Sequence, residues 1–149
     1  QLGAPVYYQS GPSTGSAKIK GGNSNWRGPV WMPVNALLVQ ALRTLGSYHG
    51  STVPVTISES GAKRTVDLAS AAEELSHRLT GLFVAGTDGS RPVHRQYDGS
   101  PDPLFGRADW KDQVLFFEYF DGDSGKGLGA SHQTGWTAMV AALIQDGQP

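Results

Sequence analysis

The chain has 149 residues, with 12 Lys and Arg against 13 Asp and Glu, so its formal net charge at pH 7 is -1. Because nucleic acids and anionic membranes are recognised through clustered positive charge, this balance predicts no nucleic-acid partner and no membrane partner. The absence of cysteine excludes disulfides and leaves the compartment undecided, and no apolar run reaches the length of a membrane span.

The first 25 residues are rich in glycine, serine, proline and asparagine and predict a loop-rich N-terminal stretch. One short extended segment is expected at Val6–Tyr8. Because the chain begins at Gln1 rather than Met, we expect it to be a piece of a longer polypeptide. We therefore divide it into a loop-rich stretch, 1–25, and a more regular portion, 26–149.

A first helix is predicted after the turn-like segment Trp26–Trp31, because Pro33 fits the first helical turn and apolar residues follow at helical spacing. Those apolar residues are Val34, Leu37, Leu38, Ala41, Leu42 and Leu45. Either Gly46 or Gly50 can end this helix. The pattern indicates an amphipathic helix with one buried face.

A small hairpin and a second helix come next. Alternating apolar residues across 53–57 and a glycine-containing turn predict a β-hairpin whose second strand is Lys63–Val66. Thr65 or Asp67 can cap the following helix. Its apolar stripe consists of Leu68, Ala72, Leu75, Leu79 and Leu82. We expect this stripe to pack against the first helix.

The last third of the chain contains fewer regular elements. Residues 85–112 predict loops, and the apolar run Gln113–Phe120 is interrupted by a single carboxylate, Glu118. A glycine-rich loop, Asp121–Ser131, leads into a third helix that Gly147 ends. The apolar residues expected on one side of that helix are Trp136, Met139, Val140, Leu143 and Ile144. Three helices and a hairpin leave these stripes short of partners, which indicates a larger helical fold.

The glycine-rich loop partly matches several known motifs, and each match lacks an essential element. Gly122–Gly125 resembles the nucleophile segment of trypsin-like proteases, but no segment supplies the base histidine and its orienting aspartate. A dinucleotide site lacks its acidic ribose ligand, and a phosphate loop would need Ser or Thr where Gly127 stands. A calcium loop built on Asp121 and Asp123 stays open, although two of its ligand positions hold other residues.

The four histidines show no spacing typical of metal ligands. They are His49, His77, His94 and His132. We expect no metal and no cofactor. Only His132 is a candidate binding residue, because it lies between the glycine-rich loop and a tryptophan-bearing helix start, where ligand contacts often gather.

Glu118 is the candidate for chemistry, because its carboxylate lies in an aromatic run. The flanking residues are Phe116, Phe117, Tyr119 and Phe120. A charge in that setting must be desolvated, paired with a cation or exposed to a water-filled cleft. The sequence leaves two interpretations open: an acid with a chemical role, or an ion pair with Arg27 or Lys126 that holds two loops together.

Trp26, Arg27 and Trp31 form a second candidate cluster. A sugar ring can stack its C–H face on an indole while its hydroxyls bind a planar cation, so this combination suits a carbohydrate ligand. The alternative is a pair of core tryptophans at a helix entrance.

Two segments together resemble a known enzyme family. Residues 22–31, followed by Pro33–Asn35, resemble the W-R-G-P-[IV]-W...N motif of glycoside hydrolase family 63, the family of processing α-glucosidase I and its bacterial relatives. Residues 117–129, followed by Gly135–Ala138, resemble the C-terminal block of that family, E-x-Y/F...G-x-G...G-W-T-A/S. Both blocks occur in the expected order, and the likeness covers about 20–149.

The resemblance implies a mainly α fold, a partial (α/α)6 toroid of helical hairpins with long loops and a small β-hairpin. It makes 26–149 the C-terminal portion of a glycosidase barrel, whose remainder would be a structural partner. It also implies inverting hydrolysis of α-glucosidic bonds in oligosaccharides or glycosides, with carbohydrate as the substrate and Glu118 as the general base. The positions that match residues lining or supporting the sugar cleft are Trp26, Arg27, Trp31 and Trp136.

Two departures limit what the resemblance implies. Ser131–Thr134 replaces a Pro-Phe-like pair of the eukaryotic enzymes, so their substrate is not carried over. The acid aspartate of the family belongs before Trp26, and no segment here resembles its surroundings. Because an inverting enzyme needs two carboxyl groups roughly 6.5–9.5 Å apart, we expect the isolated chain to be inactive. A non-catalytic carbohydrate-binding or structural helical module remains the alternative.

Overall fold

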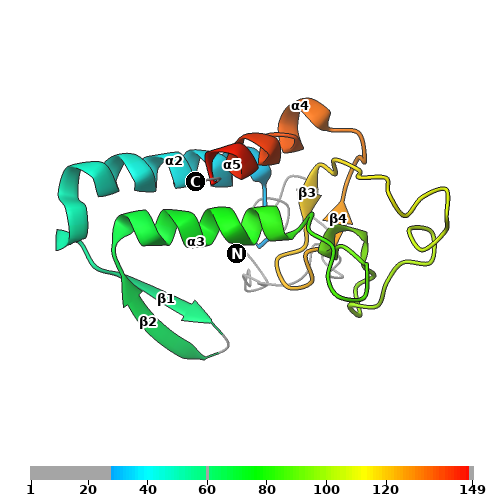
Figure 1. Ribbon diagram of the computed structural model, residues 1–149, viewed down its shortest axis with the longest axis horizontal. Helices are drawn as coiled ribbons and strands as arrows, with labels where there is room; N and C mark the ends of the chain where they lie inside the picture. The colour runs from blue at the N-terminus through cyan, green and yellow to red at the C-terminus, as the bar shows by residue number, and fades with distance from the viewer. Residues whose placement is uncertain (1–27, 60, 148–149) are drawn as a thin grey trace, which may run out of the picture.

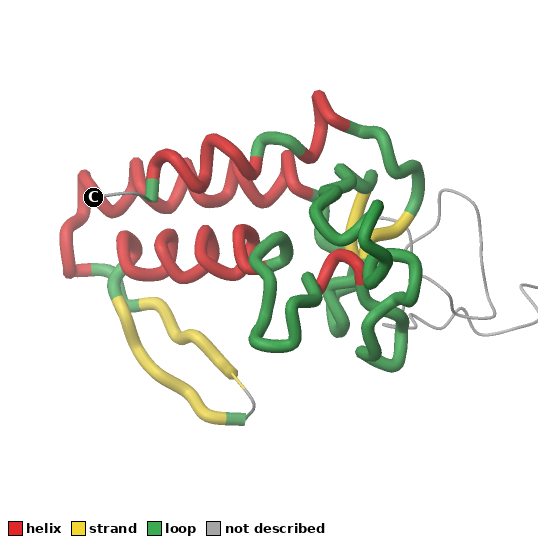
Figure 2. The backbone as a smooth tube through the Cα atoms, turned by 45° about the vertical axis from the view of Figure 1, so that its right-hand side comes forward, coloured by secondary structure: helices red, strands yellow, loops and turns green. Residues whose placement is uncertain are grey.

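The computed structural model describes residues 28–59 and 61–147, which form a mainly helical structure with a small antiparallel hairpin. The helices are α2 (Met32–His49), α3 (Leu68–Gly81), α4 (Thr134–Thr137) and α5 (Val140–Asp146), with short 3-10 turns η1 (Gly50–Thr52) and η2 (Pro92–His94). The strands are β1 (Val55–Glu59), β2 (Ala62–Val66), β3 (Tyr119–Phe120) and β4 (Gly127–Leu128). Helices α2, α3 and α5 run side by side, with the β1–β2 hairpin at one end and the loops around β3 and β4 at the other (Figures 1 and 2).

The predicted first helix is confirmed, and it ends at the second of the two candidate glycines. Helix α2 begins after Trp31 with Pro33 in its first turn and stops at Gly50, whose φ of 57° favours glycine. Gly46 lies inside the helix, where an added Cβ would come within 3.0 Å of the Ala69 backbone nitrogen. Gly46 therefore allows the close approach of α2 to α3.

The buried face predicted for α2 is wrong in part. Most of the predicted stripe is exposed, namely Val34, Leu37, Leu38 and Leu45. The buried residues are Met32, Val39 and Gly46, at a seven-residue spacing that makes a narrow seam along the helix. Because α3 and α5 cover only this strip of α2, the wider apolar face of the helix remains in water.

The hairpin and the second helix agree closely with their predictions. Strands β1 and β2 pair in antiparallel register from Val55 opposite Val66 to Glu59 opposite Ala62. Asp67 caps α3 by accepting a 2.8 Å hydrogen bond from the Ser70 backbone nitrogen, a contact that also lowers the pKa of the Asp67 carboxyl. The predicted stripe is buried or half-buried throughout and packs against α2.

The third predicted helix is interrupted, which corrects the expectation of one continuous element. Helices α4 and α5 are separated at Ala138 and Met139, where the Ala141 backbone nitrogen bonds the Ala138 oxygen three residues back rather than four. Of the five predicted apolar residues, only Val140 and Leu143 are buried. The other three are exposed, and α5 packs against α2 and α3 through its buried residues Val140 and Leu143.

The core joins the helices to β3, the strand at the end of the aromatic run. Its buried members are Met32, Val39, Ala72, Leu79, Val93, Phe120, Val140 and Leu143. Among the described residues, no helix combines the length and apolar character that crossing a membrane requires. The predicted extended segment Val6–Tyr8 and the rest of the stretch 1–25 lie outside the described residues.

Candidate active site around Glu118

The segments that carry the family resemblance meet in space. Val30 and Phe120 exchange two backbone hydrogen bonds of 2.8 and 2.9 Å, so the segment leading into α2 lies against β3. On its other side β3 pairs with β4, with Phe120 opposite Gly127 (Figure 1). The segment before α2 and the β3–β4 hairpin, which are about ninety residues apart in the sequence, therefore form one small layer beside Glu118.

Close contacts, one with the main chain and one with an aromatic ring, explain two glycines of these segments. A Cβ added to Gly122 would lie 2.5 Å from the Gly28 carbonyl oxygen, so the two segments touch through their main chains. A Cβ added to Gly127 would lie 2.2 Å from the Phe117 ring. Side chains at these positions would separate the layer that surrounds Glu118.

Glu118 is half-buried. The part of the glycine-rich loop that follows β4 holds it in place. Its backbone nitrogen donates a 2.8 Å hydrogen bond to the Ala130 oxygen, and its side-chain Oε2 accepts one of 3.3 Å from the Ala130 nitrogen. Gly129 has a φ of 73°, and a Cβ there would lie 2.5 Å from the same carboxylate oxygen. The loop thus turns at Gly129 to lie against the carboxylate.

The predicted ion pair between Glu118 and Lys126 does not form, whereas the structure does not test a pair with Arg27. The Lys126 Nζ donates to the Arg95 backbone oxygen at 3.0 Å and lies 5.3 Å from the centre of the Tyr97 ring. In the part of the chain that the structure describes, Glu118 has no salt bridge. Arg27, the other proposed partner, lies outside the described residues.

An aromatic cluster surrounds the start of α2. Trp31 stacks on Tyr119 at a centroid distance of 4.7 Å and meets the edge of Trp136 at 6.3 Å. Trp31 is 4% exposed and packs in the interior, whereas Trp136 is 36% exposed and offers a surface. The Thr137 hydroxyl donates to the Phe117 backbone oxygen and so fixes α4 to the segment that carries Glu118.

The remaining predicted site residues divide between described and undescribed parts of the chain. His132 is exposed and forms an isolated bridge with Phe116, next to a 2.8 Å bond from the Gln133 nitrogen to the Phe116 oxygen. This places His132 beside the Glu118 segment. Trp26 and Arg27 lie outside the described residues.

The calcium-loop alternative at Asp121 has a simpler structural explanation. Asp121 is buried, and its Oδ1 accepts hydrogen bonds from the Asp123 nitrogen, the Ser124 nitrogen and the Ser124 hydroxyl at 2.8–3.1 Å. The carboxylate thereby closes its own turn, as aspartates commonly do. Among the described residues, no group of three or more acidic, histidine or cysteine side chains could hold a metal ion.

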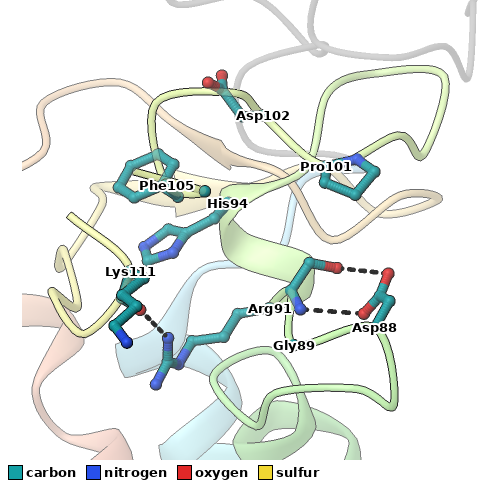
Figure 3. A pocket seen from close by; sticks show the side chains of 10 residues that line it. Asp88, Gly89, Arg91, His94, Pro101, Asp102, Phe105 and Lys111 are labelled. Atoms are coloured by element: carbon teal, nitrogen blue, oxygen red, sulfur yellow. Dashed lines mark hydrogen bonds between the residues drawn. The ribbon is translucent and has the colours of Figure 1, made fainter. Parts of the chain in front are cut away.

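A cavity of about 260 Å³ lies away from Glu118, among the loops between α3 and β3 (Figure 3). Its lining includes Asp88, Arg91, His94, Phe105 and Lys111. His94 is 3% exposed, and its ring stacks on Phe105 at 3.6 Å. Sequence reasoning assigned His94 no binding role, because no local pattern reveals that a loop residue is buried.

The buried His94 predicts a specific dependence of stability on pH. Burial, assisted by the positive charge of Arg91 and opposed by Asp102, lowers the pKa of His94 from 6.5 to about 4. Between these values the unfolded chain binds a proton at this residue that the folded chain does not. Its contribution to the free energy of unfolding is therefore full above pH 6.5 and falls by up to about 3 kcal/mol as the pH drops to 4.

Urea unfolding at several pH values, beside an NMR titration of the His94 ring, measures this effect. The variant His94→Phe keeps an aromatic ring against Phe105 and should show a shallower loss of stability between pH 6.5 and 4. A His94 ring that titrates near its ordinary pKa would contradict the prediction.

Comparisons with known proteins find one distant relative, a glucosidase, of the enzyme class that the family resemblance implies. No protein-family model matches the chain, and no solved structure matches it. An uncharacterized protein of Saccharomyces cerevisiae is 46% identical over 138 residues, which cover 91% of this chain and 12% of that protein. A mannosyl-oligosaccharide glucosidase of the same yeast is 25% identical over 119 residues, which cover 80% of this chain and 11% of that protein.

The chain thus spans little more than a tenth of the length of either yeast relative. Its distant similarity to a glucosidase runs through 80% of the chain. A glucosidase is also the kind of enzyme that the family resemblance implies.

Proposed function

We propose that this chain is the C-terminal part of an inverting α-glycosidase of the glycoside hydrolase family 63 type, and that Glu118 is its general base. The substrate would be an α-glucosidic bond in an oligosaccharide or glycoside. The acid aspartate would come from the rest of the barrel, in a longer polypeptide. The observation that supports this most directly is the meeting of both motif segments around a half-buried glutamate.

The surroundings of Glu118 suit a base that activates water. Its carboxylate accepts one hydrogen bond from the Ala130 nitrogen and has no cation paired with it among the described residues, so lone pairs remain for a water molecule. The partly exposed indole of Trp136 lies on the same aromatic cluster, where it could stack on a sugar ring. In the sugar-binding cleft that this proposal implies, His132 would lie at the rim, and Trp31 would support the cleft from within.

The exposed face of α2 supports a larger helical parent. Leu37 is 69% exposed and Tyr48 is 84% exposed, and neighbouring apolar residues of the same helix are also in water. A helix with this much uncovered apolar surface is typical of one that packs against further helices. The partial (α/α)6 toroid is therefore part of the proposal, with the remainder of the barrel as the partner of α2.

The stereochemistry of the product tests the function. The full polypeptide that carries this chain is incubated with α-glucosides of different linkage, and proton NMR follows the anomeric form of glucose as it is released. We expect the β-anomer first, because water activated by a base opposite the leaving group inverts the configuration. Release of the α-anomer would contradict inversion. Sugar binding without any hydrolysis would favour the non-catalytic module instead.

A further inference from the structure

The cavity between α3 and β3 is built by a folded loop rather than left by loose packing. Its right-hand wall in Figure 3 is the turn at Asp88, whose carboxylate accepts hydrogen bonds from the nitrogen and hydroxyl of Ser90 at 3.0 and 2.8 Å. The same carboxylate pairs with Arg95 at 3.0 Å. The charge of Asp88 is therefore balanced by Arg95, and its carboxylate oxygens are already hydrogen-bonded to residues of the cavity wall.

His94 supplies a polar atom that lacks a partner. Its Nε2 is buried and makes no hydrogen bond within the described residues. The ring stacks on Phe105 and is almost completely buried, so solvent does not supply the missing partner in this conformation. A buried polar atom without a partner typically costs about 1–3 kcal/mol, and a bound ligand with a suitable oxygen would remove that cost.

Two positive charges lie on the same side of the cavity as the His94 ring (Figure 3). The Arg91 guanidinium donates to the backbone oxygens of Phe83 and Lys111 at 3.1 and 3.0 Å. These bonds hold the guanidinium in place, and because both acceptors are neutral its positive charge is not balanced by them. Neither Arg91 nor Lys111 pairs with a carboxylate among the described residues.

The second acidic residue of the lining offsets these charges only in part, because Asp102 raises the pKa of His94 by less than Arg91 lowers it. Asp102 accepts a 2.9 Å hydrogen bond from the Leu104 nitrogen, and its carboxylate points away from the His94 ring in Figure 3. The side of the cavity at His94 thus combines a nitrogen without a partner, a fixed guanidinium and a lysine. Such a combination favours an anion over a cation or an apolar ligand.

We propose that this cavity binds a small oxyanion group, a carboxylate or a phosphate, between His94, Arg91 and Lys111. The neutral imidazole would donate its Nε2 hydrogen to an oxygen of the ligand, and the two cations would balance the charge. The site is separate from Glu118, so the inference does not depend on the proposed hydrolytic function.

Calorimetric titration of the full polypeptide with inorganic phosphate, and separately with acetate, tests this site. Lys111→Met removes one charge from an exposed residue with little risk to folding, and Lys63→Met removes an equivalent charge from exposed β2 as the control. We expect saturable binding of at least one anion, weakened about tenfold by Lys111→Met and unchanged by Lys63→Met. The anion that binds more tightly identifies the group.

Two His94 variants separate hydrogen bonding from packing. His94→Phe keeps the ring stack and should weaken binding about tenfold, whereas His94→Gln keeps a donor and should weaken it less. Circular dichroism checks that each variant folds. If a His94 variant does not fold, the comparison of Lys111→Met with Lys63→Met tests the anion site instead. Failure of both anions to bind, or equal effects of Lys111→Met and Lys63→Met, would overturn the proposal.

Discussion

Replacement of Glu118 by glutamine is expected to lower the rate of α-glucoside hydrolysis about 10²–10⁴-fold in the full polypeptide, the range that a positioned general base contributes. The amide cannot accept a proton from the attacking water. Its carbonyl oxygen can still accept the hydrogen bond that the Ala130 nitrogen gives to the native carboxylate, so the loop at Gly129 should stay in place. We therefore expect kcat to fall with the fold intact.

The control for this variant is Glu59→Gln. Glu59 is an exposed glutamate at the end of β1, and its only described ion pair is a long one of 3.6 Å with Arg78. Its replacement should leave kcat unchanged within about twofold, because exposed pairs of this kind contribute little. Undiminished hydrolysis by the Glu118→Gln variant, with Glu59→Gln also active, would remove Glu118 from the role of base.

Small-anion rescue sharpens the same test. Glu118→Ala leaves space where the base and its water were, and azide is a nucleophile that needs no base. If Glu118 activates water, azide should restore turnover in Glu118→Ala and yield a glycosyl azide of inverted configuration. A variant whose loss of activity came from misfolding would gain nothing from azide.

Gly127→Ala should destabilise the protein by about 3 kcal/mol, at the upper end of what overpacking usually costs. The new methyl group would lie against Cδ2 and Cγ of Phe117, atoms near the base of the ring that can move aside only by a change of χ1 in a half-buried side chain or by a shift of the main chain. Because Phe117 precedes Glu118, the strain would also disturb the site. Chemical denaturation monitored by tryptophan fluorescence measures the loss.

Gly135→Ala is the matched control in the same region. Nothing lies within 4 Å of a Cβ at Gly135, which is in the exposed first turn of α4. Alanine favours a helix over glycine by up to about 1 kcal/mol, so this variant should be as stable as the native protein or slightly more so. Equal stability of the two alanine variants would show that the Phe117 ring yields easily and would contradict the packing argument.

Local patterns predicted most of the helical part correctly. Helix α3 could be predicted from the sequence, because its capping residue Asp67 and its apolar stripe are both visible in that segment alone. The buried side of α2 could not be predicted in this way, because it depends on how much of that helix α3 and α5 cover. The interruption at Ala138 and Met139 likewise depends on tertiary packing, which no single-segment pattern contains.

The candidate site, too, could be predicted from the sequence only in part. Glu118 stands out in sequence because a lone carboxylate in an aromatic run needs an explanation, and the family resemblance links it to the segment before α2. The contacts that build its surroundings join distant segments, as when Thr137 bonds the Phe117 oxygen or Gly122 meets Gly28. Such contacts could not be derived from one sequence, because only the fold brings their partners together.

The pairing of Val30 with Phe120 also makes the layer around Glu118 depend on a contact between distant parts of the chain. Helix α2, its hairpin and α3 are neighbours in the chain and can associate while synthesis continues, whereas the layer around Glu118 needs a strand made much later. We therefore expect the glutamate's surroundings to form late in folding, on a support of helices whose contacts are more local.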